Sequence, residues 1–117
     1  MRLICCLFIA LSSLASPVAH GAGMEGYSTV LRVEYVLECM SDREGSRYEM
    51  MNKCSCVLDR LGALYSAAEF VDAWTTSKAI SIAGERGAAL RDNEQVQQEA
   101  RNFRDAVEQA EADCFLR

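Results

Sequence analysis

Residues 46–65 read SRYEMMNKCSCVLDRLGALY, a stretch that joins a helical apolar pattern to two cysteines two positions apart. Its apolar residues recur every three or four positions, which is typical of one face of an amphipathic helix. Ser46 followed by Glu49 predicts a capping box, in which each side chain satisfies a backbone N–H group at the helix start. The predicted inward face of this helix comprises Tyr48, Met51, Cys54, Leu58, Leu61 and Tyr65.

Cys54 and Cys56 decide how this helix connects to the rest of the chain. Side chains two positions apart on a helix point about 200° away from each other, so these two cysteines cannot bond to one another while the helix is intact. Outside the first 21 residues, the remaining cysteines are Cys39 and Cys114. The arrangement that closes the shorter first loop, which we favour, is Cys39–Cys54 with Cys56–Cys114. The other arrangement, Cys39–Cys56 with Cys54–Cys114, joins the two cysteines that lie in apolar stripes.

Either arrangement ties this helix to the helices before and after it. Each bridge is expected to add about 2–4 kcal/mol to the free energy of unfolding, mainly by constraining the unfolded chain. An even number of cysteines in a small exported chain is typical of such a disulfide framework.

The segments on both sides of residues 46–65 also show helical patterns. Residues 28–40 are predicted to form the first helix, with a core-facing stripe of Val30, Val33, Leu37 and Met40, widened by Leu31, Tyr35 and Val36. The third helix is predicted to begin with a second capping box, Ser66 with Glu69, and to end near Gly84 as a left-handed residue. Its expected apolar face is Phe70, Ala73, Trp74, Ser77 and Ile80.

The last helix has the most regular pattern in the chain. Residues 85–91 are expected to form a loop, and Asp92 with Gln95 is expected to open the helix that follows. Because no segment alternates apolar and polar residues over the length of a strand, we predict an all-α fold, a compact bundle of about four amphipathic helices stapled by two disulfides. The stripe of the last helix is Val96, Ala100, Phe103, Val107, Ala110 and Cys114.

The first 21 residues have the layout of a cleavable signal peptide. A short positive start, Met1-Arg2, precedes the apolar run Leu3–Leu14, and small residues at 19 and 21 offer a cleavage site. A helix over that run of 12 residues would span about 18 Å, too little for a hydrocarbon core of about 30 Å. We therefore predict a signal peptide at 1–21, a single domain at 22–117 with no membrane span after cleavage, and a location in the periplasm or outside the cell.

Composition and charge exclude several classes of function. The formal net charge of −5 argues against nucleic-acid binding, which needs a basic face. The single histidine, His20, falls in the predicted signal peptide, so the domain has none for Ser-His-Asp or Cys-His catalysis. No glycine-rich phosphate loop follows a predicted strand. We therefore predict a protein that is not an enzyme and has no cofactor.

Two groups of residues are candidates for binding. Met50, Met51, Cys54 and Cys56 bring together thioethers and thiols, ligands that Cu(I) prefers, and they allow an alternative role in copper or thiol-redox handling. The simpler interpretation is that no metal site exists, because thiols of exported proteins tend to be oxidised. Phe70 and Trp74 lie one helical turn apart and would mark a surface for a partner if they are partly open.

The cysteine pattern resembles that of small four-cysteine helical proteins exported to the proteobacterial periplasm, most of which have no assigned function. The residues that carry this resemblance are Cys39, the motif KCSCVLD at 53–59, and Cys114. The resemblance implies no catalytic residues. In size and class the chain is also similar to acid-activated periplasmic chaperones, although those usually carry one bridge rather than two.

These observations lead to one main functional hypothesis and two alternatives. The main hypothesis is a non-enzymatic periplasmic binding or accessory protein that contacts another periplasmic or envelope protein. The first alternative is copper or thiol-redox handling through the Cys-x-Cys motif at 54–56. The second alternative is a small chaperone of the acid-stress type.

Overall fold

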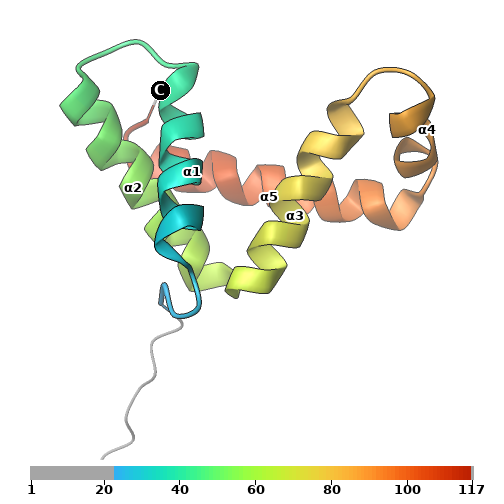
Figure 1. Ribbon diagram of the computed structural model, residues 1–117, viewed down its shortest axis with the longest axis horizontal. Coiled ribbons are helices and arrows are strands. Elements are labelled where there is room, and N and C mark those ends of the chain that lie inside the picture. The colour runs from blue at the N-terminus through green and yellow to red at the C-terminus, as the bar shows by residue number, and fades with distance from the viewer. Residues whose placement is uncertain (1–22, 117) are drawn as a thin grey trace, which may run out of the picture.

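The computed structural model describes residues 23–116, apart from the side chain of Arg86. The predicted signal peptide at 1–21 lies outside the described residues. Within residues 23–116 the secondary structure is entirely helical, as the sequence pattern predicts. The helices are α1 (Thr29–Ser41), α2 (Arg47–Leu64), α3 (Ala67–Ser81), α4 (Glu85–Arg91) and α5 (Glu94–Asp113) (Figure 1).

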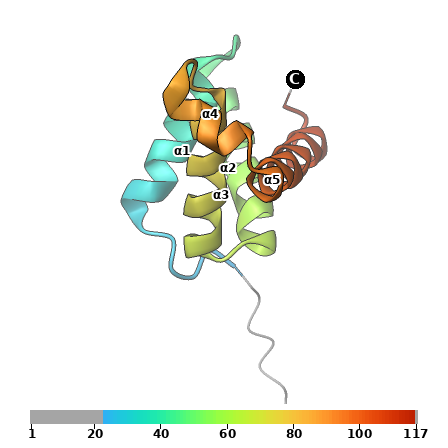
Figure 2. The ribbon, with the colours of Figure 1, turned by 90° about the vertical axis from the view of Figure 1, so that its right-hand side faces the viewer.

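The helices form a compact bundle, as predicted, with five helices in residues 23–116 where about four were expected. α1 and α2 lie side by side as a hairpin, and α3 diverges from them in a V (Figure 1). α5 crosses these helices and packs against both α2 and α3, as the end-on view of α5 in Figure 2 shows. The short α4 connects α3 to α5 at the far end and contacts both. The end of α5 lies beside α2, to which Cys114 is bonded.

Two disulfides hold this arrangement. Cys39 of α1 is bonded to Cys54 of α2, and Cys56 of α2 is bonded to Cys114 at the end of α5. The Cα atoms are 5.9 Å apart in each pair, within the usual range for a disulfide. Of the two arrangements that the sequence leaves open, the structure has the one that closes the shorter first loop.

The centre of the core is an aromatic cluster around Phe70, whose side chain is 0 % exposed. Its ring centroid lies 5.4 Å from those of Tyr27 and Tyr35, 5.6 Å from that of Trp74 and 5.8 Å from that of Phe103. Tilted and edge-on pairs of this kind contribute about 0.5–1.5 kcal/mol each beyond the burial of their area. Phe70 therefore joins α1, α3 and α5 in one core.

The predicted inward faces of α5 and of the second half of α2 are confirmed. Along α5 the stripe residues are buried or half-buried, and Phe103 is 3 % exposed. At the start of α2 the prediction is wrong, because Tyr48 is 73 % and Met51 is 44 % exposed. The buried residues that α2 contributes are Met50, Cys54, Val57, Leu58, Leu61 and Gly62.

The predicted core face of α1 is correct only in part. Val30, Val33 and Leu37 are exposed, whereas Tyr35 is buried and the other predicted residues, Leu31, Val36 and Met40, pack against the core. At about 100° per residue, Val33 and Leu37 both point about 160° away from Tyr35, whereas Cys39 points only about 40° away from it. Because Cys39 is bonded to Cys54, the disulfide turns the Tyr35 face of α1 towards α2 and leaves the aliphatic stripe outside.

The capping interactions at the helix starts agree with the prediction at α3 and differ from it at α2 and α5. Ser66 and Glu69 form the predicted capping box of α3. Ser46 begins α2 as predicted but makes no side-chain capping bond, and Glu49 instead pairs with the Lys53 Nζ at 2.7 Å. The start of α5 lies one residue later than predicted, since the Asn93 Oδ1 accepts from the backbone N–H of Val96.

The loop predicted for residues 85–91 is wrong, because these residues form α4. Gly84 does take a positive φ of 87°, but α3 ends at Ser81 and Gly84 serves as the N-cap of α4. The Arg91 guanidinium donates to the carbonyl oxygens of Ile82 at 2.6 Å and Gly84 at 2.9 Å. These bonds hold the end of α4 against the segment that joins it to α3. A pattern of seven residues is too short to predict a helix that depends on such contacts.

The two disulfides should differ in their effect on stability. In the chain-entropy description, separations of 15 and 58 residues correspond to about 3 and about 4 kcal/mol respectively. We predict that the double substitution Cys56→Ser/Cys114→Ser lowers the free energy of unfolding in urea by about 1 kcal/mol more than Cys39→Ser/Cys54→Ser does. If the two double variants lost equal free energy of unfolding, or if Cys39→Ser/Cys54→Ser lost more, loop length would not control the stabilisation by these disulfides.

The two faces of α1 should respond differently to substitution. We predict that Val33→Gln and Leu37→Gln each change the free energy of unfolding by less than about 0.5 kcal/mol, because both side chains are exposed. Tyr35→Ala, which opens the aromatic cluster, should cost about 3–5 kcal/mol. Urea denaturation of the three variants measures this difference, and a large loss for Leu37→Gln would contradict the observed rotation of α1.

Candidate functional site

A cleft of about 470 Å³ opens between α1 and α3, with α5 as its floor. It exists because α1 and α3 diverge, and no Cα atom of α1 lies within 8 Å of one in α3. α1 and the turn after it supply five of the lining residues, α3 supplies three, and α5 supplies four. We call this the α1–α3 cleft, and its lining includes Tyr35, Glu38, Asp42, Arg43, Trp74, Lys78, Phe103, Arg104, Val107 and Glu111.

The apolar part of the cleft consists of Tyr35, Trp74, Phe103 and Val107. The rings of Tyr35 and Trp74 meet across the opening with centroids 5.6 Å apart and planes inclined at 64°. Trp74 is half-buried, so part of its indole faces the cleft. Phe70, the other residue predicted for a partner surface, is completely buried beneath it and cannot contact a partner directly.

An ion pair crosses the mouth of the cleft. Lys78 of α3 pairs with the carboxylate of Glu38 from α1, and the Lys78 Nζ also lies 3.7 Å from the centroid of the Trp74 ring. Both charged side chains are 47 % exposed. An exposed pair of this kind contributes only about 0–1 kcal/mol, so it can separate at little cost.

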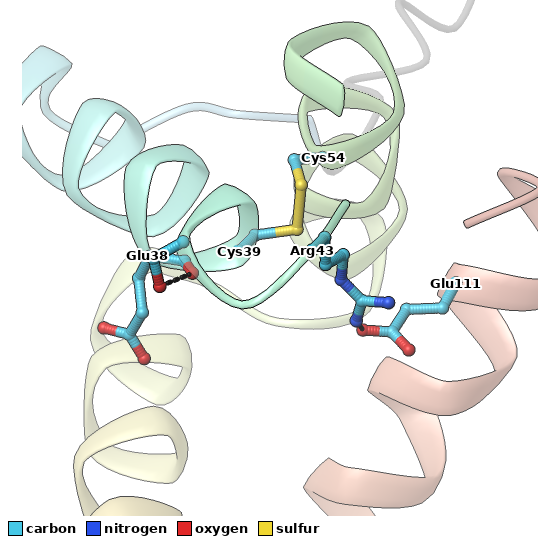
Figure 3. Close-up of polar contacts among 6 residues, drawn as sticks. Glu38, Cys39, Arg43, Cys54 and Glu111 are labelled. Atoms are coloured by element: carbon cyan, nitrogen blue, oxygen red, sulfur yellow. Dashed lines mark hydrogen bonds and ion pairs between the residues drawn. A yellow bond between two sulfur atoms is a disulfide. The ribbon is translucent and has the colours of Figure 1, made fainter. Parts of the chain in front are cut away.

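A second ion pair closes the other end of the cleft. Figure 3 shows Arg43, in the turn after α1, reaching the carboxylate of Glu111 on α5, with the Cys39–Cys54 disulfide close by. Each side chain is 24 % exposed, which is about half the exposure of the pair at the mouth. This pair therefore belongs to the scaffold and links the turn after α1 to α5.

Two charged residues of the lining have no such partner. Within residues 23–116, the side chains of Asp42 and Arg104 make no ion pair and no hydrogen bond. Arg104 also lines a neighbouring hollow of about 160 Å³ with Ile80, Arg91, Gln97 and Arg101. The cleft thus presents two charges that are available to a ligand, the cation of Arg104 on α5 and the anion of Asp42 in the turn after α1.

Burial controls the protonation of the tyrosines near the cleft. Burial raises the pKa of Tyr35 above its ordinary value, and the charge of Glu111 raises it further while Arg43 opposes this shift. Burial also raises the pKa of Tyr27 to about 12, with a smaller contribution from Glu69. The Tyr27 hydroxyl donates to the carbonyl oxygen of Tyr65 at 3.0 Å. Both tyrosines therefore keep their protons to a more alkaline pH than a tyrosine in an unfolded chain does.

The residues considered for copper do not come together as a site. Cys54 and Cys56 are both bonded in disulfides and offer no thiolate. Met50 is buried at 6 % exposure, whereas Met51 is 44 % exposed. In the described part of the chain, no group of three or more His, Cys, Asp or Glu side chains is placed to hold a metal ion.

Comparisons with protein-family models, curated proteins and solved structures found no match to this chain. Among residues 23–116, no helix combines the length and the apolar character needed to cross a membrane. The cleft must therefore be interpreted from its own residues. Sequence reasoning identified Trp74 but missed Glu38, Lys78 and Arg104, although Lys78 lies four positions after Trp74 and so shares its helix face.

The raised pKa of Tyr35 predicts a loss of stability at alkaline pH. The folded protein holds this proton more tightly than the unfolded chain, whose tyrosine pKa is about 10. The stabilisation is therefore complete below pH 10 and decreases as the pH rises above 10 towards the raised pKa. Urea denaturation at a series of alkaline pH values should show this decrease, and Tyr35→Phe should weaken it. An identical decrease in Tyr35→Phe would assign it to other groups.

Proposed function

We propose that this chain is a non-enzymatic exported protein that binds another periplasmic or envelope protein in the α1–α3 cleft. The observation that carries the proposal is the cleft itself, an opening with an aromatic wall and accessible charges on a scaffold held by two disulfides. Disulfides persist in oxidising compartments, which supports export.

The lining favours binding of a protein over chemistry on a small substrate. Tyr, Trp and Arg are the residues enriched at protein–protein contacts, and Tyr35, Trp74 and Arg104 all line the cleft. The volume of about 470 Å³ is sufficient for a few side chains of a partner segment. Because the pair of Arg43 with Glu111 closes one end of the cleft, such a segment enters and leaves through the mouth, where Lys78 meets Glu38.

The surface elsewhere also supports a protein partner. Val30, Val33 and Leu37 lie exposed on the outer face of α1, which is the helix that forms one wall of the cleft. Contiguous apolar side chains on a surface commonly mark protein contacts. Two opposite faces of α1 are therefore suited to association.

Site-specific photo-crosslinking in the exporting cell tests this proposal. Asp42 lines the cleft and its side chain has no partner in the described residues, so a photo-reactive amino acid there should leave the fold intact. Asp59 is a matched control, because it is an exposed aspartate of α2 outside the cleft. We predict a discrete protein adduct from position 42 that is absent from position 59.

A further variant makes the outcome specific to the cleft. Trp74→Ala removes the aromatic wall and should abolish the adduct from position 42 while the disulfides keep the scaffold folded. Equal adducts from positions 42 and 59, or no adduct from position 42, would refute binding in the cleft.

A further inference from the structure

We infer that the α1–α3 cleft recognises an acidic peptide segment of its partner, with Lys78 and Arg104 as the carboxylate-binding residues. Without the partner, the carboxylate of Glu38 takes the place of the ligand carboxylate at Lys78. This inference rests on the proposed function and specifies the chemistry of the segment that is bound. It follows from the charges around the cleft, from the weakness of one ion pair and from the position of Trp74.

The first argument is the gathering of cations at one end of the cleft. The chain carries a formal net charge of −5, yet the hollow that adjoins the cleft is lined by Arg91, Arg101 and Arg104 and by no acidic residue. Arg91 is engaged by backbone carbonyl oxygens and Arg101 by the side chains of Gln97 and Gln98. Arg104 therefore remains as the guanidinium that an incoming carboxylate can reach, and the other two arginines line the same hollow.

The second argument is the pair between Lys78 and Glu38. Glu38 brings a carboxylate to the Lys78 ammonium from the opposite side of the mouth, so the site already shows one carboxylate bound. Both side chains are 47 % exposed, and an exposed pair is weak enough for exchange. A carboxylate from a partner can thus replace Glu38 at Lys78 and free the mouth of the cleft.

The third argument distinguishes a peptide from a free anion. Lys78 lies over the Trp74 ring, so a carboxylate at Lys78 has apolar surface directly beside it. The half-buried side chain of Val107 extends this surface into the cleft, above the buried Tyr35. A free anion would leave these apolar groups uncovered, whereas a segment that alternates acidic and aliphatic side chains satisfies both kinds of surface.

Trp74 provides the measurement, because it is the single tryptophan of the chain and lies in the wall of the cleft. Three synthetic peptides of equal length, in which leucine alternates with Glu, Gln or Lys, contain no aromatic residue and leave tryptophan emission to the protein. We expect the Glu peptide to change Trp74 fluorescence saturably and to bind about tenfold more tightly than the Gln peptide. The affinity of the Glu peptide should fall with added salt.

Variants then assign the effect to named residues. Lys78→Gln and Arg104→Gln should each weaken binding of the Glu peptide about fivefold, and Glu38→Gln should strengthen it by removing the competing carboxylate. Arg60→Gln is the matched control, because Arg60 is an exposed arginine of α2 outside the cleft. It should leave the affinity unchanged.

The outcomes separate this inference from the proposed function. Equal affinity for the Gln or Lys peptide would overturn the acidic preference and leave cleft binding in place. Free glutamate matching the Glu peptide at equal concentration would show an anion site only and would also overturn it. If no peptide alters Trp74 fluorescence, the acidic segment is refuted, and the photo-crosslink from position 42 then decides whether the proposed function survives.

Discussion

The placement of Cys54 and Cys56 on opposite sides of α2 is the constraint on which the rest of the structure depends. Because their side chains diverge, one disulfide leads to α1 and the other to the end of α5. α2 is thereby fixed between two elements that are distant from each other in sequence. α3 then completes the core by placing Phe70 between the rings of Tyr35 and Phe103.

The sequence predicts the helices well and their orientation less well, for a reason that α1 illustrates. Periodicity reveals which residues share a face, but α1 has apolar residues on two faces, Val30, Val33 and Leu37 on one and Tyr35 on the other. The longer aliphatic stripe was the natural choice for the core, yet the bond from Cys39 to Cys54 turns the other face inward. Local pattern cannot decide between two apolar faces when a covalent constraint sets the rotation. α5 has one apolar stripe only, and there the prediction succeeds.

The candidate site shows the same limit at the level of single residues. Phe70 and Trp74 share a stripe of α3, but the crossing of α1 and α5 buries the first and leaves the second at the edge of the cleft. Lys78 was within reach of sequence reasoning, since it follows Trp74 by one helical turn. Its pairing with Glu38 joins residues 40 positions apart and depends on how far α3 diverges from α1. Such a contact belongs to the tertiary arrangement and leaves no local signal.

The disulfides fix one wall and the floor of the cleft in a domain too small for a large core. A short chain buries a limited apolar core, so covalent links add stability that packing alone supplies only in part. Here α1 is held by Cys39 and by the pair of Arg43 with Glu111, and α5 is held by Cys114. The wall and the floor of the cleft are thus fixed by bonds outside its mouth. Two contacts described in residues 23–116 span the opening, the rings of Tyr35 and Trp74 and the exposed pair of Lys78 with Glu38, and an exposed ion pair of this kind is weak.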